Sequence, residues 1–398
     1  MNEFDSLLDW IDEQHPLMLD RVIEWSKINS YSFNKIGLKL LSKKILDAFE
    51  PLEADQQNVE LLPFKYVDLK GEAKEIQFPP PLIFRKRPLA PKQAIFVIHM
   101  DTSYPPEDSL EEAYLIVGRY LRGKGVVDAK GGIAVLLTVL EALEKSDAAD
   151  TIGWRAVINT DEEIGSPCSG RILEFLARDC DMGFVFEPCL PDGNLIGSRK
   201  GAGFFTIVAR DNHHSEESSN AIEAVAACVS RLQALNGTRP GLTVNAGMIQ
   251  GGKAANLVPH VAVLRFEVKV KSFDDQFYAE NKIQDILDDV SREKKIKLAL
   301  QGKFFIPPKP LDAKTYALLE HFHECGEKVG LDIDWKDSSL VCDGNILQSA
   351  GVPTIDSLGV QGSLTSSVEE KLYIDSLKER AKLVTFFLLK WAKGQLAI

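Results

Sequence analysis

The chain of 398 residues lacks any apolar stretch long enough to span a membrane, which takes about 20 residues for a helix. Its first residues, MNEFDSLLDWIDEQHP, are acidic and amphipathic, and they lack the basic segment and apolar core of a secretory signal. We therefore expect a cytoplasmic protein that does not enter a membrane.

The chain also has fewer basic than acidic residues, and its cysteines are widely spaced. The 46 Lys and Arg residues are outnumbered by 58 Asp and Glu residues, which gives a net charge of -12. Such a surface repels phosphate groups, so nucleic acids and anionic membranes are not expected as partners. The six cysteines include no Cys-x-x-Cys pair, which argues against a zinc knuckle or a disulfide framework. Part of the acidic excess could instead be metal ligands.

The order of strands and helices predicts an α/β fold with two domains. A chain of this length exceeds the usual size of a single core. In its first half, apolar strands alternate with helices, which is typical of a mostly parallel sheet flanked by helices. The expected strands are 59–68, 82–87, 94–98, 154–159 and 182–187, and the expected helices lie within 5–50 and at 132–145 and 168–177. The active site of such a sheet lies at the carboxyl ends of its strands.

From Gly203 the pattern changes to strand, helix, strand, strand, helix, strand, which predicts an inserted ferredoxin-like α+β unit. A helix at 315–329, a strand at 352–358 and a helix at 374–391 then resume the first pattern. We therefore expect a catalytic domain in two segments, 1–202 and 310–398, and an inserted lid domain at 203–309. The outer strands of the lid would expose backbone groups that a second subunit could pair, so the lid is also the expected dimer interface.

One histidine and five carboxylates stand after apolar strands or at strand–helix junctions. They are His99, Asp101, Asp128, Glu162, Glu163 and Glu187. Hard oxygen ligands with one imidazole suit zinc, cobalt or manganese, and a shared carboxylate suits two ions about 3.5 to 4 Å apart. If the Glu162–Glu163 pair stays extended, its side chains point to opposite faces, so one could bind metal while the other faces the substrate water. Each motif alone could be an ordinary turn or a solvated charge pair, but their order favours a metal site.

Eight motifs follow one another within the stretch from about Ile95 to Leu377, the last of them ending at Gly359: IFVIHMDT, GKGVVDAKGG, TDEEIGS, FEP, RKGAG, GGKAANLVP, CDGN and GVPTIDSLG. Their order resembles the zinc-dependent metallopeptidase and deacylase family that contains glutamate carboxypeptidase, acetylornithine deacetylase, succinyl-diaminopimelate desuccinylase and aminoacylase. The resemblance implies a zinc exopeptidase-like catalytic domain, a lid through which two subunits form a homodimer, and one or two zinc ions. It also implies hydrolysis of an amide bond in a small peptide or N-acyl amino acid.

The resemblance implies a role for each residue of the cluster. His99 and Glu187 would bind the first metal, Asp128 would bridge the two ions, and Glu163 would bind the second. Glu162 would be the general base that takes a proton from the attacking water and passes it to the leaving amine.

Three further residues take their expected roles from the same resemblance. Asp101 would accept the ring N–H of His99 and so fix its tautomer. In the lid, His214 would stabilise the oxyanion of the reaction and Asn256 would contact substrate. Whether His213 or His214 faces the site depends on strand register.

The chain also departs from the family pattern. Relatives close the second metal site with a histidine after the GVPTIDSLG strand, where this chain has Thr365, or Ser366 on a one-residue shift. A hydroxyl is a far poorer zinc ligand than an imidazole. Lys269 and Ile306 stand where relatives often place arginine, so a free α-carboxylate would be held differently, or the substrate is not a C-terminal glutamate.

Two alternatives to an active enzyme stay open at this point. A relative with a decayed second site would be a mononuclear or inactive protein that binds a small ligand. A structural protein would use the lid only to dimerise. The retained carboxylates argue against both, because buried unpaired carboxylates cost stability without a metal.

Overall fold

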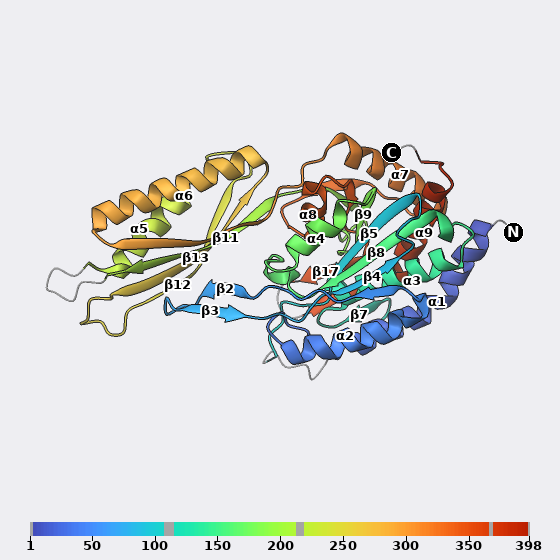
Figure 1. Ribbon diagram of the computed structural model, residues 1–398, viewed down its shortest axis with the longest axis horizontal. Helices are drawn as coiled ribbons and strands as arrows, with labels where there is room; N and C mark the ends of the chain where they lie inside the picture. The colour runs from blue at the N-terminus through green and yellow to red at the C-terminus, as the bar shows by residue number, and fades with distance from the viewer. Residues whose placement is uncertain (1–2, 107–114, 212–218, 366–368, 397–398) are drawn as a thin grey trace.

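The computed structural model describes residues 3–106, 115–211, 219–365 and 369–396. The chain forms a larger lobe, which carries both described ends, and a smaller elongated lobe beside it (Figure 1). Within the described ranges, no helix combines the length and the apolar character that crossing a membrane requires.

The larger lobe is built on a six-stranded sheet in the order β1-β4-β8-β5-β9-β16. Its strands are β1 Asp55–Gln57, β4 Leu82–Lys86, β5 Lys92–His99, β8 Ile152–Asn159, β9 Met182–Val185 and β16 Thr354–Ile355. The strands β8, β5, β9 and β16 run parallel, whereas β4 and β1 pair antiparallel at one edge. The α/β class predicted from the sequence is confirmed, with an antiparallel edge added to the parallel strands.

Helices cover both faces of this sheet, and successive side chains of β5 point to the two faces in turn. Ala94, Phe96 and Ile98 pack into the core beneath one set of helices, and Ile95 and Val97 pack into the other core. The first set comprises α1 Glu3–Ser26, α2 Lys35–Phe49, α3 Gly132–Lys145, α7 Ala313–Val329 and α9 Ser376–Ala392. The second comprises α4 Gly170–Ala177 and α8 Asp343–Ser349. Burial on both faces explains why the parallel strands are apolar throughout.

The smaller lobe is a four-stranded antiparallel sheet, in the order β12-β13-β11-β14, with two helices on one face. Its elements are β11 Gly201–Arg210, α5 Ala221–Gln233, β12 Thr243–Gly251, β13 Val261–Val270, α6 Phe273–Lys294 and β14 Lys297–Ile306. Alternate residues of β11, such as Ile207 and Ala209, pack beneath the helices, while Val208 faces the other way. The exact domain limits stay a prediction.

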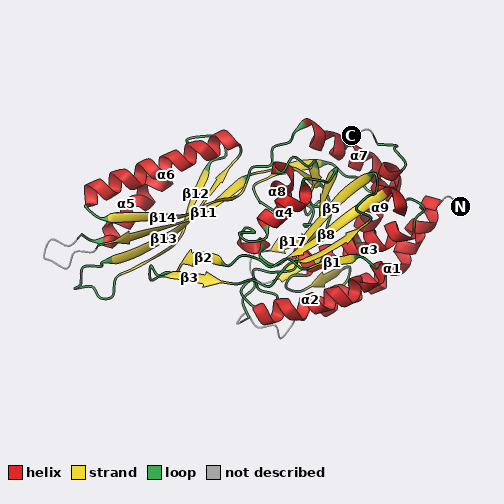
Figure 2. Cartoon of the chain, in the orientation of Figure 1, coloured by secondary structure: helices red, strands yellow, loops and turns green. Residues whose placement is uncertain are grey.

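Three smaller sheets in the described part of the chain were not predicted. A hairpin of β2 Phe64–Val67 and β3 Ala73–Ile76 reaches from the larger lobe along the smaller one (Figures 1 and 2). A second sheet has the order β17-β18-β7-β6, with β6 Leu115–Val117, β7 Tyr120–Arg122, β17 Gly362–Thr365 and β18 Glu369–Tyr373. The third pairs β10 Leu195–Arg199 with β15 Trp335–Ser338. The strand expected at 59–68 is therefore shorter than predicted, and it belongs to the hairpin rather than to the central sheet.

Candidate metal and active site

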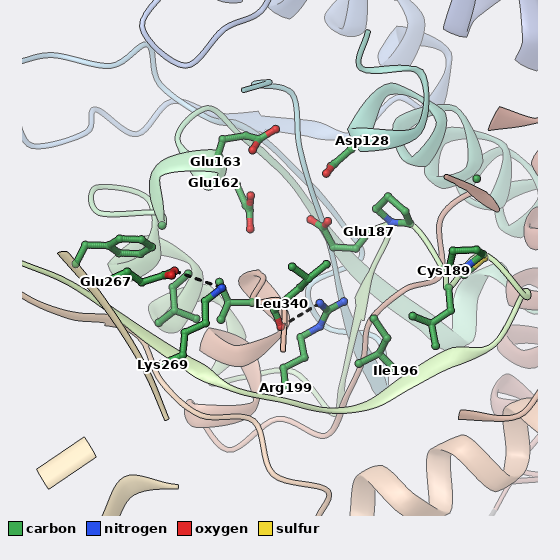
Figure 3. Close-up of a pocket in the computed structure, with 18 residues that line it drawn as sticks. Asp128, Glu162, Glu163, Glu187, Cys189, Ile196, Arg199, Glu267, Lys269 and Leu340 are labelled. Carbon is green, nitrogen blue, oxygen red and sulfur yellow. Dashed lines mark hydrogen bonds and ion pairs between the residues drawn. The ribbon is translucent and has the colours of Figure 1, made fainter. Parts of the chain in front are cut away.

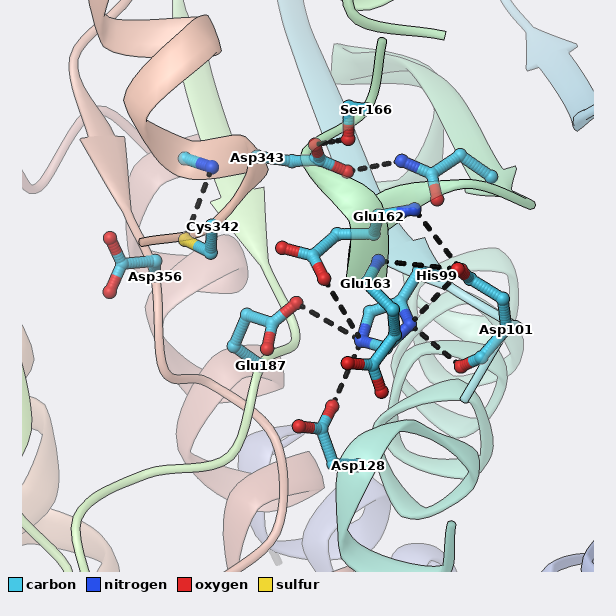
Figure 4. Close-up of polar contacts among 12 residues, drawn as sticks. His99, Asp101, Asp128, Glu162, Glu163, Ser166, Glu187, Cys342, Asp343 and Asp356 are labelled. Carbon is cyan, nitrogen blue, oxygen red and sulfur yellow. Dashed lines mark hydrogen bonds and ion pairs between the residues drawn. The ribbon is translucent and has the colours of Figure 1, made fainter. Parts of the chain in front are cut away.

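His99 is the last residue of β5, so it stands at the carboxyl end of a parallel strand. Its side chain is only 1% exposed, and carboxylates from three other segments turn toward its Nε2 atom (Figure 4). That atom lies 2.9 Å from Oδ1 of Asp128 and 3.5 Å from Oε1 of Glu187. Oε2 of Glu162 is slightly farther, at 4.0 Å. The imidazole therefore lies at the centre of an acidic cluster.

Asp101 fixes this imidazole differently from the sequence expectation. Nδ1 of His99 lies 3.0 Å from the main-chain oxygen of Asp101, and the Asp101 carboxylate is farther away, at 3.4 Å. A carbonyl oxygen can only accept, so the ring proton belongs on Nδ1 and leaves the lone pair of Nε2 for a metal ion. The carboxylate of Asp101 instead accepts the main-chain N–H groups of Glu162 and Glu163, each at 3.2 Å.

The adjacent glutamates do not remain extended, which corrects the geometry expected of them. Residues Glu162–Ile164 form a single 3₁₀ turn after β8, closed by Gly165 in the left-handed conformation at φ 88°. The hydrogen bonds that Asp101 accepts from both glutamates hold this turn. Both glutamate side chains consequently reach the same cluster rather than opposite faces of a strand (Figures 3 and 4).

The cluster contains two groups of residues that could each hold a metal ion. In one, ligand atoms of His99, Asp128 and Glu163 lie within 4.8 Å of one another; in the other, those of His99, Glu162 and Glu187 do so. One imidazole with several carboxylates is a donor set that suits zinc or a similar divalent ion. The second group differs from the expected first site. That site was to consist of His99, Glu187 and the bridging Asp128, whereas this group contains Glu162 instead of Asp128.

Electrostatics favour a cation in this cluster. Burial, together with the charge of Asp128, raises the pKa of Glu163 to about 9 and that of Glu187 to about 8. Burial opposes a charge on His99, but Glu187, Asp101 and Asp128 outweigh it and raise the His99 pKa well above its usual range. Without a metal, the cluster therefore retains protons that ordinary carboxylates lose. A divalent ion would neutralise the repulsion and displace those protons.

Glu370 supports the loop that carries Asp128, a role that was not predicted from the sequence. The carboxylate of Glu370 is 1% exposed and accepts main-chain N–H groups of Gly125, Val127 and Asp128 at 2.8, 2.7 and 3.0 Å. Burial and the nearby Asp128 charge raise the pKa of Glu370 to about 7. Within VEEK this residue looks like part of a solvated charge run, and nothing local reveals a contact with a loop more than two hundred residues earlier.

The remaining predicted site residues have different outcomes. Thr365 ends β17 and pairs with Glu369 in the ladder, but its side chain is not described. His213, His214 and Ser366 lie outside the described residues, so the expectations for them stay predictions. Among the described residues, His99 is the only histidine in either candidate metal group.

Asn256 and Lys269 belong to the smaller lobe, but only one of them reaches the site. Asn256 is exposed in a turn and does not line the cavity beside the cluster. Lys269 lines that cavity and forms an ion pair with Glu267 at 3.4 Å. Ile306, the other position of departure from the family, lines the same cavity.

A cavity of about 500 Å³ lies beside the carboxylates and is lined by both lobes (Figure 3). The larger lobe contributes Asp128, Glu162, Glu163 and Glu187, and β11 and β13 contribute Phe204, Glu267 and Lys269. Because the walls come from both lobes, a change in their relative position would reshape this cavity.

The chain passes between the lobes twice, near Arg199 and near Lys309. Residues of the CDGN and GVPTIDSLG motifs hold these two crossings in place. The side-chain amide of Asn345 donates to the main-chain oxygens of Lys200 and Pro307 at 2.9 and 2.7 Å. Arg199 and Lys309 also exchange main-chain hydrogen bonds at 2.9 and 3.0 Å. These contacts tie the outgoing and returning segments together.

Arg199 and Lys309, one at each crossing, both form ion pairs with the buried carboxylate of Asp356. Asp356 lies 2.9 Å from Arg199 and 3.3 Å from Lys309. The side chains of Asp356 and Lys309 are completely buried. Burial opposes ionisation of Asp356, but the two cations outweigh it and hold its pKa below the usual range. The motifs therefore position the lobes as well as border the site.

Comparison with known proteins agrees with this architecture. The model of Peptidase family M20/M25/M40 matches residues 95–390. Carboxypeptidase G2 of Pseudomonas sp. (strain RS-16) is 24% identical over 321 residues, which cover 76% of this chain and 75% of that protein. Succinyl-diaminopimelate desuccinylase of Psychrobacter sp. (strain PRwf-1) is 25% identical over 288 residues, which cover 66% of this chain and 69% of that protein. The structure of human carnosine dipeptidase 1 superposes with a TM-score of 0.75 at 16% identity and covers 99% of both chains, which shows a shared fold.

The fold and the matched family define a hydrolase of the metallopeptidase and amidohydrolase class, which acts on carbon–nitrogen bonds. The chain belongs to Peptidase family M20/M25/M40. The resemblance drawn from the sequence motifs is thus confirmed, and the described residues include groups that could hold metal ions.

Proposed function

We propose that the chain hydrolyses an amide bond in a small peptide or an N-acyl amino acid. The observation that carries this proposal is the gathering of His99 and four carboxylates at one sheet edge, beside a cavity that both lobes line. The names of two relatives denote a carboxypeptidase and a desuccinylase, and both activities break amide bonds.

In this proposal His99, Asp128, Glu163 and Glu187 hold one or two zinc ions, and cobalt or manganese would suit the same donors. Bound metal would supply Lewis acidity, which makes water a stronger acid and polarises an amide carbonyl. Asp128 would be the shared ligand, as the family resemblance implies, and its carboxylate lies 2.9 Å from Nε2 of His99 and groups with that of Glu163.

Glu162 acts as the general base in this proposal. The family resemblance gives it this role, and its oxygen lies 4.0 Å from Nε2 of His99, close enough to reach a water held at the cluster. Burial and the charge of Glu187 raise the pKa of Glu162 well above the ordinary range. Such a carboxylate can hold a proton taken from the attacking water until the leaving amine accepts it.

We also infer which side of the substrate carries a negative charge. Lys269 brings an ammonium group into the cavity, where Glu267 neutralises part of it at 3.4 Å. A carboxylate on the leaving amine would compete with Glu267 for this cation. Because ammonium is a point charge rather than a bidentate fork, such a contact would select charge more than orientation.

The proposal includes a homodimer joined through the smaller lobe. β12 forms an edge of its sheet, and most of its residues are exposed, including Met248 at 48% and Ile249 at 55%. An exposed edge strand with apolar side chains offers both backbone and side-chain contacts to a symmetry-related copy.

The competing function is that of a mononuclear or inactive relative that binds a small ligand, and the missing second histidine favours it. Metal analysis of the purified protein, combined with a screen of N-acyl amino acids and dipeptides, separates the two. Two equivalents of zinc with turnover would support the proposal. One equivalent or none, without turnover of any amide, would support the alternative.

A further inference from the structure

A second cavity, of about 610 Å³, also borders the active-site turn. It is bounded by the β2–β3 hairpin, by the sheet of the smaller lobe and by Glu163 and Ile164. Among the residues that line it are the rings of Phe64, Tyr66, Phe204 and Phe305, all of them half-buried. Aromatic rings that face a shared hollow at an active site are typical of a pocket for an apolar ligand group.

The hairpin is anchored against the smaller lobe, so its two rings are held in place. Arg265 donates to the main-chain oxygen of Val67 at 2.7 Å, and Arg210 donates to that of Gly71 at 2.8 Å. Val67 packs with two valines of β11 and β13 on the face of the sheet that α5 and α6 leave free. This docking makes the hairpin part of the cavity wall rather than a loose loop.

The rings themselves form a continuous wall across the junction of the lobes. Phe64 stacks on Tyr66 with ring centroids 6.0 Å apart, and it meets Phe305 edge-on at 6.3 Å. The first pair lies within the hairpin, and Phe305 belongs to β14. A flat apolar group entering this cavity would therefore find aromatic contacts from both lobes.

The aromatic cavity adjoins the cavity beside the carboxylates. Glu163, Phe204 and Glu267 line both of them. The ring of Phe204 lies directly against the active-site turn, since a Cβ added to Gly165 would come within 2.9 Å of that ring. An amide placed at the glutamates would thus extend one way toward Lys269 and the other way toward the aromatic rings.

We propose that the aromatic cavity binds a large apolar acyl group of the substrate, with Phe64 and Tyr66 as specificity residues. The inference rests on the proposed amide hydrolysis. The carboxylate side of the substrate occupies the first cavity near Lys269, so the acyl side occupies the second. The substrate class is then an amino acid whose amine carries an aromatic or long aliphatic acyl group.

The test uses two amides of one amino acid, the N-acetyl and the N-(3-phenylpropanoyl) derivatives. The wild type should turn over the second with a kcat/KM at least tenfold higher. Phe64→Ala and Tyr66→Ala should each reduce that preference about tenfold, because each removes a ring that contacts the phenyl group. Phe277→Ala is the matched control, since this ring on α6 is 69% exposed and does not line the cavity, and it should leave the preference within twofold.

A binding arm separates failure of this inference from failure of the proposed function. Calorimetry on the metal-loaded Glu162→Gln variant measures the affinity for both amides without turnover, alone and combined with Phe64→Ala. A binding preference for the phenylpropanoyl amide that Phe64→Ala abolishes supports the aromatic cavity even if the wild type hydrolyses neither amide. Equal affinities, or equal losses on both amides in Phe64→Ala and Tyr66→Ala, would overturn it even if hydrolysis is found. Thermal melting of each variant checks that the fold persists.

Discussion

Asp356→Asn should destabilise the protein strongly, because it removes the only negative charge that the structure places between two buried cations, Arg199 and Lys309, in the described part of the chain. Breaking a buried ion pair from one side costs about 3 to 5 kcal/mol, since the partner charge is left uncompensated. Asparagine can still accept one hydrogen bond from Arg199, so we expect the lower end, about 3 kcal/mol. The expected catalytic domain exceeds 250 residues, so that loss should lower Tm by about 6 °C, the lower end of the range for domains of 150 to 250 residues.

The stability lost in Asp356→Asn should depend on the charge of Lys309, and a double-mutant cycle can measure this dependence. If Lys309 is uncharged, as in Lys309→Met, Asp356→Asn leaves only Arg199 unpaired. The double variant should therefore lose less stability than the sum of the two single variants, by about 1 kcal/mol or more. Thermal and urea unfolding measure all four corners of the cycle.

The pH dependence of this site has a definite sign. Asp356 has a lowered pKa in the folded protein, so its contribution is fully present above the ordinary carboxyl pKa and is lost as pH falls below it. Asp337→Asn is the control, because Asp337 is exposed on β15, and it should change stability by no more than about 0.5 kcal/mol. An Asp356→Asn variant as stable as this control would refute the account of the crossings.

Three further predictions concern the metal site and the dimer. Chelator-stripped protein should lose stability as pH rises from about 5 toward 9, because the raised pKa values of Glu163, about 9, and Glu187, about 8, make their ionisation unfavourable in the fold. Added zinc should restore Tm and release protons. A Tm that does not change with pH would contradict the proposed acidic cluster. Thr365→His should tighten the second step of a zinc or cobalt titration at least tenfold, about 1.4 kcal/mol, by supplying an imidazole; no change would mean that the loop does not face the ions. Ile249→Asp on the exposed edge strand should give monomers in sedimentation, with Leu89→Asp, whose side chain is 96% exposed on the larger lobe, as a control that stays dimeric. If the Ile249 variant stays dimeric, β12 is not the interface.

Much of the central architecture could be predicted because burial leaves a local signature. The apolar run before His99 has alternate residues facing two cores, and its last residue falls where a parallel strand delivers a side chain to the sheet edge. The same reasoning located the segment of Glu187, whereas Asp128 was found from its glycine-rich motif before a predicted helix, and the structure brings both to His99.

What the sequence could not provide depends on contacts between distant segments. Glu370 accepts three N–H groups from the Asp128 loop, yet its own neighbours give no sign of that burial. The turn of the adjacent glutamates depends on hydrogen bonds to Asp101, a residue from another strand end. The sequence of the β2 segment predicts an ordinary strand, because its docking depends on contacts that Val67 makes with the distant smaller lobe.

The most direct test of the central claim compares metal content and turnover in Glu162→Gln and Glu163→Gln. We expect Glu162→Gln to retain the metal content of the wild type while kcat falls by several orders of magnitude, because the change removes proton transfer and keeps the ligands. Glu163→Gln should instead lose metal. If Glu162→Gln loses metal while Glu163→Gln retains it, the two roles are reversed, and if Glu162→Gln keeps full activity, Glu162 is not the base.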